Sequence, residues 1–192
     1  FPWRVETPYS QTQNQPVLVK MVAVYTLGLG LSGKVNGFEK VTVQVQYNAI
    51  YDSLGNISSP LQAVDNTLLI DQTAPTFASL AVEDDNSSVN VAFSNPVYNA
   101  TGGSGSLEKE DFVISMAGGV AVLKSTTPSS LTYIDSSNTY KLGLSLEGVP
   151  DGYEVVTLSP VENSIYDAAN NVANTAQARS KVNLIDKALP VI

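Results

Sequence analysis

Apolar and polar residues alternate in short runs along most of the chain, and Gly, Pro, Asn, Asp or Ser ends each run. A period of two is typical of β-strands with one buried face, and the residues that end the runs favour turns. Strands are therefore predicted near residues 76–82, 88–93, 112–115, 120–125, 131–134, 140–146, 154–160, 164–166 and 182–185. Because no alternation of strands and helices competes with this pattern, the sequence predicts an all-β protein.

A single short segment, SLEKEDF at residues 106–112, carries a helical signal. Ser106 belongs to the residue types that cap the start of a helix, and the charged residues after it would form one turn. The same segment holds Glu108, Glu110 and Asp111, which are the residue types of a paired-carboxylate catalytic site. Nothing around them predicts a cleft, so a solvated loop is the favoured interpretation.

The chain repeats itself with an offset of 115 positions. Residues 25–77, laid over residues 140–192 without a gap, give about 21 identities in about 53 positions. The phrases IYDSLGN and IYDAANN share this offset, and so do LIDQTAP and LIDKALP. A match of this length in one register indicates a duplicated unit of about 115 residues, which is the size of a common domain.

The repeat predicts how the chain is divided. Residues 77–185 form one complete unit, and a junction at 71–76 joins it to an incomplete first unit at 1–70. Residues 186–192 form a second junction and the first strand of a further unit. The N-terminal stretch FPWRVETPYSQTQNQP is rich in Pro and Gln and has no likeness to the repeat.

The first unit contains no equivalent of the opening strands of the second, such as the phrase SVNVAFSNPVY. One explanation is that the chain is a window on a longer array, with these strands upstream. The other is head-to-tail donation, in which the C-terminal end of one subunit completes the first unit of the next. A sheet that lacks strands exposes unpaired edges, which favour aggregation.

Three phrases stand in a fixed order in the second unit: APTF at residues 74–77, VAFSNPV at 91–97 and IYDAANN at 165–171. With these phrases the chain resembles the bacterial Ig-like domains that are repeated in surface-layer proteins and giant surface adhesins. The resemblance implies tandem Ig-like Greek-key β-sandwiches in an extracellular, cell-surface protein. One departure is Asn170, where the family prefers Gly, but Asn also tolerates a left-handed backbone.

The repeated phrases also have structural interpretations of their own. Asp52 and Asp167 are predicted to accept backbone N–H groups in Asx turns, with Gly55 and Asn170 supplying a positive φ. Each Asp follows a Tyr that is predicted to pack as a corner residue. The proline that ends each LID phrase stiffens a junction, so that an array of such units would act as a semi-rigid rod.

Composition removes several classes of function. The net charge is −8 without a basic cluster, which argues against a nucleic-acid partner, and no apolar run approaches a membrane span. Neither His nor Cys occurs, so the commonest general base, the usual triad partner and the thiolate metal ligands are all missing. Together with the lack of phosphate-binding and nucleophile motifs, this predicts a protein that is not an enzyme.

Calcium is the one cofactor that the sequence leaves open, because this ion takes carboxylate, carbonyl and amide oxygens. Ig-like surface domains bind it between units, although the strict calcium-loop pattern is absent here. The candidate ligands lie at the junctions, in an acidic run and in the repeated turns: Asp71, Asp186, Glu83, Asp84, Asp85, Asp52 and Asp167. Trp3 and Tyr9, outside the repeat, are candidate contacts for a carbohydrate ligand.

We therefore expect a non-enzymatic structural protein, a stalk, filament or surface-layer building block. Its partners would be neighbouring repeats or copies of itself, assembled head to tail. The first alternative is a cell-adhesion or carbohydrate-binding module that recognises a surface glycan or a protein receptor. The second is an accessory domain of a secreted hydrolase.

Overall fold

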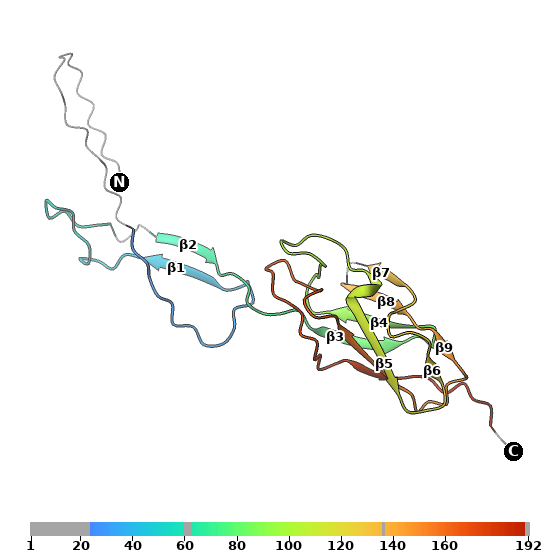
Figure 1. Cartoon of the computed structure of the whole chain (residues 1–192). Helices are drawn as coiled ribbons and strands as arrows, with labels where there is room; N and C mark the ends of the chain where they lie inside the picture. Colours follow the sequence, from blue (N-terminus) through green and yellow to red (C-terminus); the bar gives the residue numbers. More distant parts are fainter. Residues whose placement is uncertain (1–23, 60–62, 136, 191–192) are drawn as a thin grey trace, which may run out of the picture. The chain divides into compact units, whose positions relative to one another are not determined.

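The computed structural model describes residues 24–59, 63–135 and 137–190 (Figure 1). The chain separates into two compact units, residues 1–32 and 33–192, and the described part of the first unit forms neither helix nor strand. The described residues of the second unit contain eleven strands in antiparallel pairs and one short 3-10 helix. The predicted all-β fold is thus confirmed, and no described helix is long and apolar enough to cross a membrane.

Four strands of the 77–185 segment form one antiparallel sheet in the order β3-β4-β8-β7. Their bounds are β3, Phe77–Val82; β4, Ser88–Phe93; β7, Leu131–Asp135; and β8, Thr139–Gly143. In the β4–β8 ladder Val89 faces Leu142 and Val91 faces Tyr140, and all four side chains are buried. One face of this sheet is therefore apolar, as the alternation in the sequence predicts.

A second sheet has the order β11-β10-β5 and is also antiparallel. Its strands are β5, Phe112–Ala117; β10, Val155–Pro160; and β11, Lys181–Asn183. A small ribbon of β6, Val122–Leu123, and β9, Leu146–Glu147, completes the segment. In β10 every second side chain is buried, so this sheet also presents one apolar face.

The apolar faces of the two sheets share a single core. It includes Val91 and Leu142 from the four-stranded sheet and Val156 and Leu158 from the three-stranded sheet, each at most 1% exposed. Ile165 joins the same cluster from the loop after β10 and is fully buried. Each such side chain contributes about 1.5–3 kcal/mol through burial, so this core is what holds the sheets together.

The short 3-10 helix, Lys109–Asp111, lies within the segment predicted to be helical, but the predicted cap is wrong. Glu108 rather than Ser106 precedes the helix, and its backbone N–H donates to Asp111 Oδ2 at 2.7 Å. The two carboxylates cap each other's backbone groups, which a search limited to Ser, Thr, Asp and Asn at the cap position overlooks.

The first copy of the repeat reproduces the β10–β11 pairing 115 positions earlier. Strands β1, Lys40–Gln44, and β2, Ala63–Leu68, are antiparallel and pair Lys40 with Leu68 and Val41 with Thr67. The equivalent pairs in the second copy are Val155 with Asn183 and Val156 with Val182. The sequence identity between the copies therefore has a counterpart in strand register.

Two core side chains of the second copy have equivalents in the first copy that are exposed. Leu27 is 63% exposed and Ile50 is 54% exposed, whereas their equivalents Leu142 and Ile165 are fully buried. In the second copy, β4 pairs with β8, which carries Leu142, and β5 pairs with β10, which precedes the loop with Ile165. No strand with the place of β4 or β5 occurs among the described residues before 71, so the apolar face of the first copy has no cover there.

These matched positions give a stability test. We expect Ile165→Ala to lower the free energy of unfolding of the 77–185 core by about 2–5 kcal/mol, because it opens a cavity in close-packed surroundings. Ile50→Ala, in the same IYD phrase but exposed, should change it by less than about 0.5 kcal/mol. Urea unfolding followed by circular dichroism measures both values, and equal losses would contradict the described core.

Candidate functional site

The turn that closes the second copy is built around the Asp167 carboxylate. Its Oδ1 accepts the backbone N–H groups of Ala169 at 2.9 Å and Asn171 at 2.8 Å, and its Oδ2 accepts the Asn171 side-chain amide at 2.8 Å. Asn170 has a φ of +71°, the left-handed conformation that the sequence predicts for it. The carboxylate is buried but accepts three hydrogen bonds, so the Asx-turn prediction is confirmed.

The same hydrogen bonds recur in the first copy. Asp52 Oδ1 accepts the N–H groups of Leu54 at 2.9 Å and Asn56 at 2.8 Å, and Oδ2 accepts the Asn56 side-chain amide at 2.7 Å. Gly55 supplies the positive φ, at +83°. The Asn56 side-chain amide, followed by its backbone N–H, lowers the pKa of Asp52.

The two tyrosines that precede these turns differ in environment. The Tyr166 hydroxyl donates to the carbonyl of Asn163 at 2.7 Å, and the Tyr166 backbone exchanges hydrogen bonds with Tyr98 at 2.8 Å. This matches the corner role predicted for Tyr166. Tyr51 is 54% exposed, because the strands that would cover it have no described counterpart.

A second buried carboxylate, that of Glu154, lies just before β10. Its Oε1 accepts the backbone N–H groups of Val120 at 3.1 Å and Ala121 at 2.9 Å. Its Oε2 accepts those of Asp151 at 3.2 Å and Gly152 at 3.1 Å. The side chain is fully buried, so these donors replace the water that the charge would otherwise require.

Burial alone raises the pKa of Glu154, but the backbone N–H groups around it lower the pKa by more. The net effect is a pKa below the usual value, so the group is ionised at neutral pH. The approach of the 118–121 loop depends on glycine, because a Cβ on Gly119 would lie 2.2 Å from the Glu154 carboxyl carbon. Sequence reasoning missed this arrangement, although Glu39 and Glu154 are identical across the repeat.

The junction residues Asp71 and Asp186 also bind backbone groups. Asp71 Oδ1 accepts the N–H of Thr73 and Asp186 Oδ1 that of Ala188, each at 2.8 Å. The carbonyl of Asp71 accepts the side-chain amide of Asn171 at 3.1 Å, which ties the 71–76 junction to the closing turn. The two side chains therefore shape the junctions themselves.

The acidic run at residues 83–85 forms the turn between β3 and β4. Glu83 accepts the Asn90 side-chain amide at 2.6 Å and lies 3.4 Å from Lys141 Nζ, and both lower its pKa, Asn90 more strongly. Asp85 accepts the N–H of Ser87 at 2.9 Å. These bonds give the acidic run a structural role in the turn.

The predicted calcium ligands are therefore spread over separate turns and junctions. In the part of the chain that the structure describes, no three acidic side chains gather in a way that could hold a metal ion. Calcium binding stays a prediction, and the contacts above give most of these carboxylates a structural role. Trp3 and Tyr9, the predicted carbohydrate contacts, lie outside the described residues.

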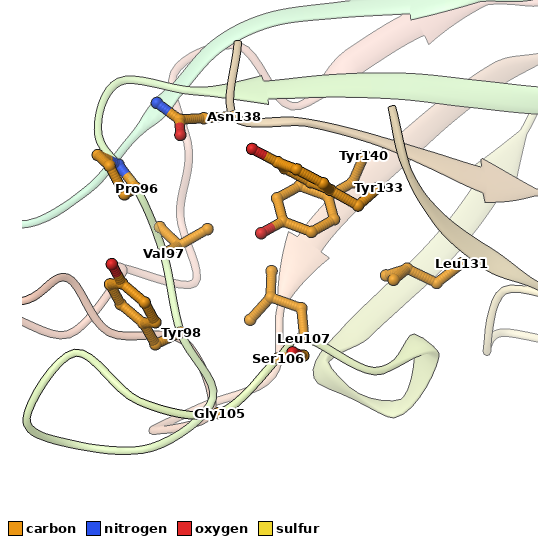
Figure 2. A pocket seen from close by; sticks show the side chains of 10 residues that line it. All are labelled: Pro96, Val97, Tyr98, Gly105, Ser106, Leu107, Leu131, Tyr133, Asn138 and Tyr140. Atoms are coloured by element: carbon orange, nitrogen blue, oxygen red, sulfur yellow. The ribbon is translucent and has the colours of Figure 1, made fainter. Parts of the chain in front are cut away.

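An open pocket of about 300 Å³ lies on the surface of the 77–185 segment (Figure 2). It lies between the β7–β8 edge of the four-stranded sheet and the segment that follows β4. Its lining comes from residues 96–98 and 105–107 and from Leu131, Tyr133, Asn138 and Tyr140. No local sequence pattern predicts this pocket, because three separate segments supply its walls.

The rings of Tyr133 and Tyr140 lie next to each other in this pocket, with centroids 5.0 Å apart and planes tilted by 54°. Tyr133 is about half exposed, at 52%, whereas Tyr140 is buried. Burial, and then the neighbouring Tyr133 and Tyr98, raise the pKa of Tyr140, so its hydroxyl stays protonated. The pocket therefore combines apolar ring surface with neutral hydroxyl groups.

Comparison with known proteins adds nothing to this geometry: no family model, curated protein or solved structure matches the chain.

The Glu154 contacts predict a pH-dependent contribution to stability. Its pKa is lowered on folding, so the contribution is present above the unfolded value of about 4.3 and is lost as pH falls through the lower folded value. We expect Glu154→Gln to cost about 1–3 kcal/mol of unfolding free energy at pH 7, because an amide cannot accept all four N–H groups. The cost should shrink at pH 3.

Urea unfolding at both pH values measures this difference. Glu39→Gln is the matched control, because Glu39 is exposed and its carboxylate accepts the N–H of Asn36 at 3.0 Å in a local turn. Its effect should stay below about 0.5 kcal/mol at either pH. A Glu154→Gln cost that is the same at pH 7 and pH 3 would contradict the role given to the charge.

Calcium binding has a direct thermal test. A ligand that binds only the folded chain raises the melting midpoint with concentration. If the predicted acidic residues bind calcium, the midpoint of the chain in millimolar CaCl₂ will exceed that in EDTA, and Asp71→Asn or Asp186→Asn will reduce the difference. A midpoint that is the same in both solutions removes the calcium prediction.

Proposed function

We propose that the chain is part of a tandem array of Ig-like Greek-key β-sandwiches that serves as an extracellular structural element, such as a stalk, filament or surface layer. Strand order supports the sandwich. If β3, β4, β5, β7, β8, β10 and β11 are lettered A to G, the sheets read A-B-E-D and G-F-C. Those are the two sheets of a constant-type immunoglobulin domain.

The observation that carries the proposal is a set of backbone hydrogen bonds that recurs at the repeat offset. Ser58 N–H donates to Ile50 O at 2.9 Å, and Ala173 N–H donates to Ile165 O at the same distance. Two further bonds of the first copy have equivalents in the second. Leu69 N–H donates to Glu39 O, as Leu184 N–H does to Glu154 O, both at 3.0 Å. Gln72 N–H donates to Val35 O, as Lys187 N–H does to Pro150 O, both at 2.8 Å. Two of the three bonds join residues at least 30 positions apart, so they support a duplication that extends beyond the local turns.

The junction favours a semi-rigid connection over a flexible linker. Pro75 is fully buried, and the backbone N–H of Phe77 donates to the Gln177 side chain at 3.0 Å. Asp71 is held by Asn171 at 3.1 Å, as described above. A proline with fixed φ and several hydrogen bonds leaves this segment little freedom, which suits a protein that spans distance.

The chain also enters and leaves the 77–185 module at opposite ends of β3. It enters at Phe77, where the strand begins, and Ile185 is bonded to Asn86 in the turn after the strand ends, at 2.7 and 2.9 Å. A pulling force would therefore run along the strands and load their hydrogen bonds together. This is the expected behaviour of a module whose role is mechanical. Head-to-tail assembly of subunits stays a prediction.

Stretching the 192-residue chain between terminal handles tests the proposal. We expect one abrupt unfolding event from the 109 residues at 77–185, which release roughly 360–390 Å of chain at about 3.3–3.6 Å per residue, less the distance between the ends of the folded segment. Single-molecule force spectroscopy measures the gain directly.

Ile165→Ala provides the control in this experiment. It should lower the force of the event and leave the length gain unchanged, because it weakens the core without altering the size of the folding unit. Gradual extension without a discrete event would contradict a mechanical role for the module.

A further inference from the structure

The pocket in Figure 2 contains polar side-chain groups that have no hydrogen-bond partner among the described residues. The hydroxyls of Tyr98, Tyr133 and Tyr140 and the side chains of Ser106 and Asn138 make no hydrogen bond within the described part of the chain, whereas the hydroxyl of Tyr166 does. None of the five is among the buried atoms that lack a partner, so water reaches them. A ligand in the pocket would therefore find donors and acceptors that are already solvated and free to bond.

These groups point toward a shared space. Figure 2 shows the Tyr133 and Tyr140 rings side by side, with their hydroxyl ends directed toward the wall that carries Pro96, Val97 and Tyr98. Asn138 lies at the rim above them, with a left-handed φ of +53°. Aromatic rings, aliphatic side chains and polar groups thus line the same pocket.

The chemistry of the lining selects a neutral ligand. None of the ten lining residues is Asp, Glu, Lys or Arg, so a charged group would enter without an ionic partner. A phosphate or sulfate would also meet the net charge of −8 of the chain. The volume of about 300 Å³ is at the small end of ligand pockets, which suits one or two sugar rings.

We propose that this pocket binds a neutral saccharide, with the exposed face of Tyr133 as the stacking surface and Tyr98, Ser106 and Asn138 as hydrogen-bonding groups. A sugar ring presents an apolar C–H face and hydroxyls at its edge. This combination matches an aromatic wall flanked by neutral donors and acceptors. The inference stands apart from the tandem array, because it needs only the 77–185 segment.

Binding is tested with the ¹⁵N-labelled 192-residue chain. Glucose, galactose, mannose, N-acetylglucosamine, maltose and cellobiose are each added at millimolar concentration while amide resonances are recorded. Shifts confined to residues 96–107 and 131–140 with at least one of these sugars support the proposal. No shift with any of them overturns it, as does a shift map centred elsewhere on the chain.

Variants separate stacking from hydrogen bonding. Tyr133→Ala should weaken binding by about tenfold or more because the stacking face is lost, and Tyr98→Phe should weaken it by roughly two- to fivefold because one hydrogen-bonding hydroxyl is lost. Tyr153→Ala is the matched control, since Tyr153 is 76% exposed and does not line the pocket. Unchanged affinity in Tyr133→Ala overturns the proposal. If circular dichroism shows that Tyr133→Ala is unfolded, the shift map of the unsubstituted chain decides whether the pocket binds the sugar.

Two other ligands are included because aromatic pockets also accept them. Choline tests a cation held on the ring faces, and a proline-rich peptide tests an extended peptide ligand. If either one shifts the pocket resonances and no saccharide does, the saccharide assignment is wrong. The stretching experiment is unaffected by these outcomes, so failure of the pocket and failure of the array can be told apart.

Discussion

The buried carboxylate of Glu154 ties three segments of the 77–185 segment's second sheet together. Its oxygens accept N–H groups from the loop after β5 and from the turn before β10, and its backbone carbonyl accepts Leu184 beyond β11. Burying an ionised carboxylate away from water costs free energy unless hydrogen-bond donors replace the water. All four N–H donors are therefore needed, and so is Gly119, because a larger residue there would clash with the carboxylate. That requirement holds together the ends of β5, β10 and β11, the three strands of one sheet.

The other turns and junctions use the same principle with shorter side chains. Four aspartates accept backbone N–H groups in this way: Asp167, Asp52, Asp71 and Asp186. These hydrogen bonds hold the loops in place, a role that disulfides or metal ions have in other small domains. In the described residues, every non-glycine position with a positive φ is an asparagine. A cysteine-free chain thus fixes its loops with Asp, Asn and Gly, and leaves the apolar residues to the core.

Strands with unbroken alternation were predictable from the sequence, and SVNVAF at β4 matches its predicted range. Residues 140–146 were predicted as one strand but divide at Gly143, because Leu144 N–H bonds to Ser87 outside the sheet. The strand predicted at 120–125 shrinks to β6, since Glu154 takes the N–H groups of Val120 and Ala121. Glu154 competes with strand pairing for these N–H groups, and this competition depends on a tertiary contact. The pocket lined by Tyr98, Tyr133 and Tyr140 also depends on tertiary contacts, which a local sequence pattern does not contain.

The exposed apolar face of the first copy has a consequence for how the chain withstands digestion. Proteases cut where the backbone unfolds locally, and local unfolding costs the least free energy where few side chains are buried. Leu27, Phe38 and Ile50 lie in such a region, whereas the core after Pro75 is close-packed. Limited treatment with chymotrypsin would therefore trim the chain to a resistant fragment that begins near the 71–76 junction. The stable unit of this protein would thus begin about 50 residues after the point where its sequence starts to repeat.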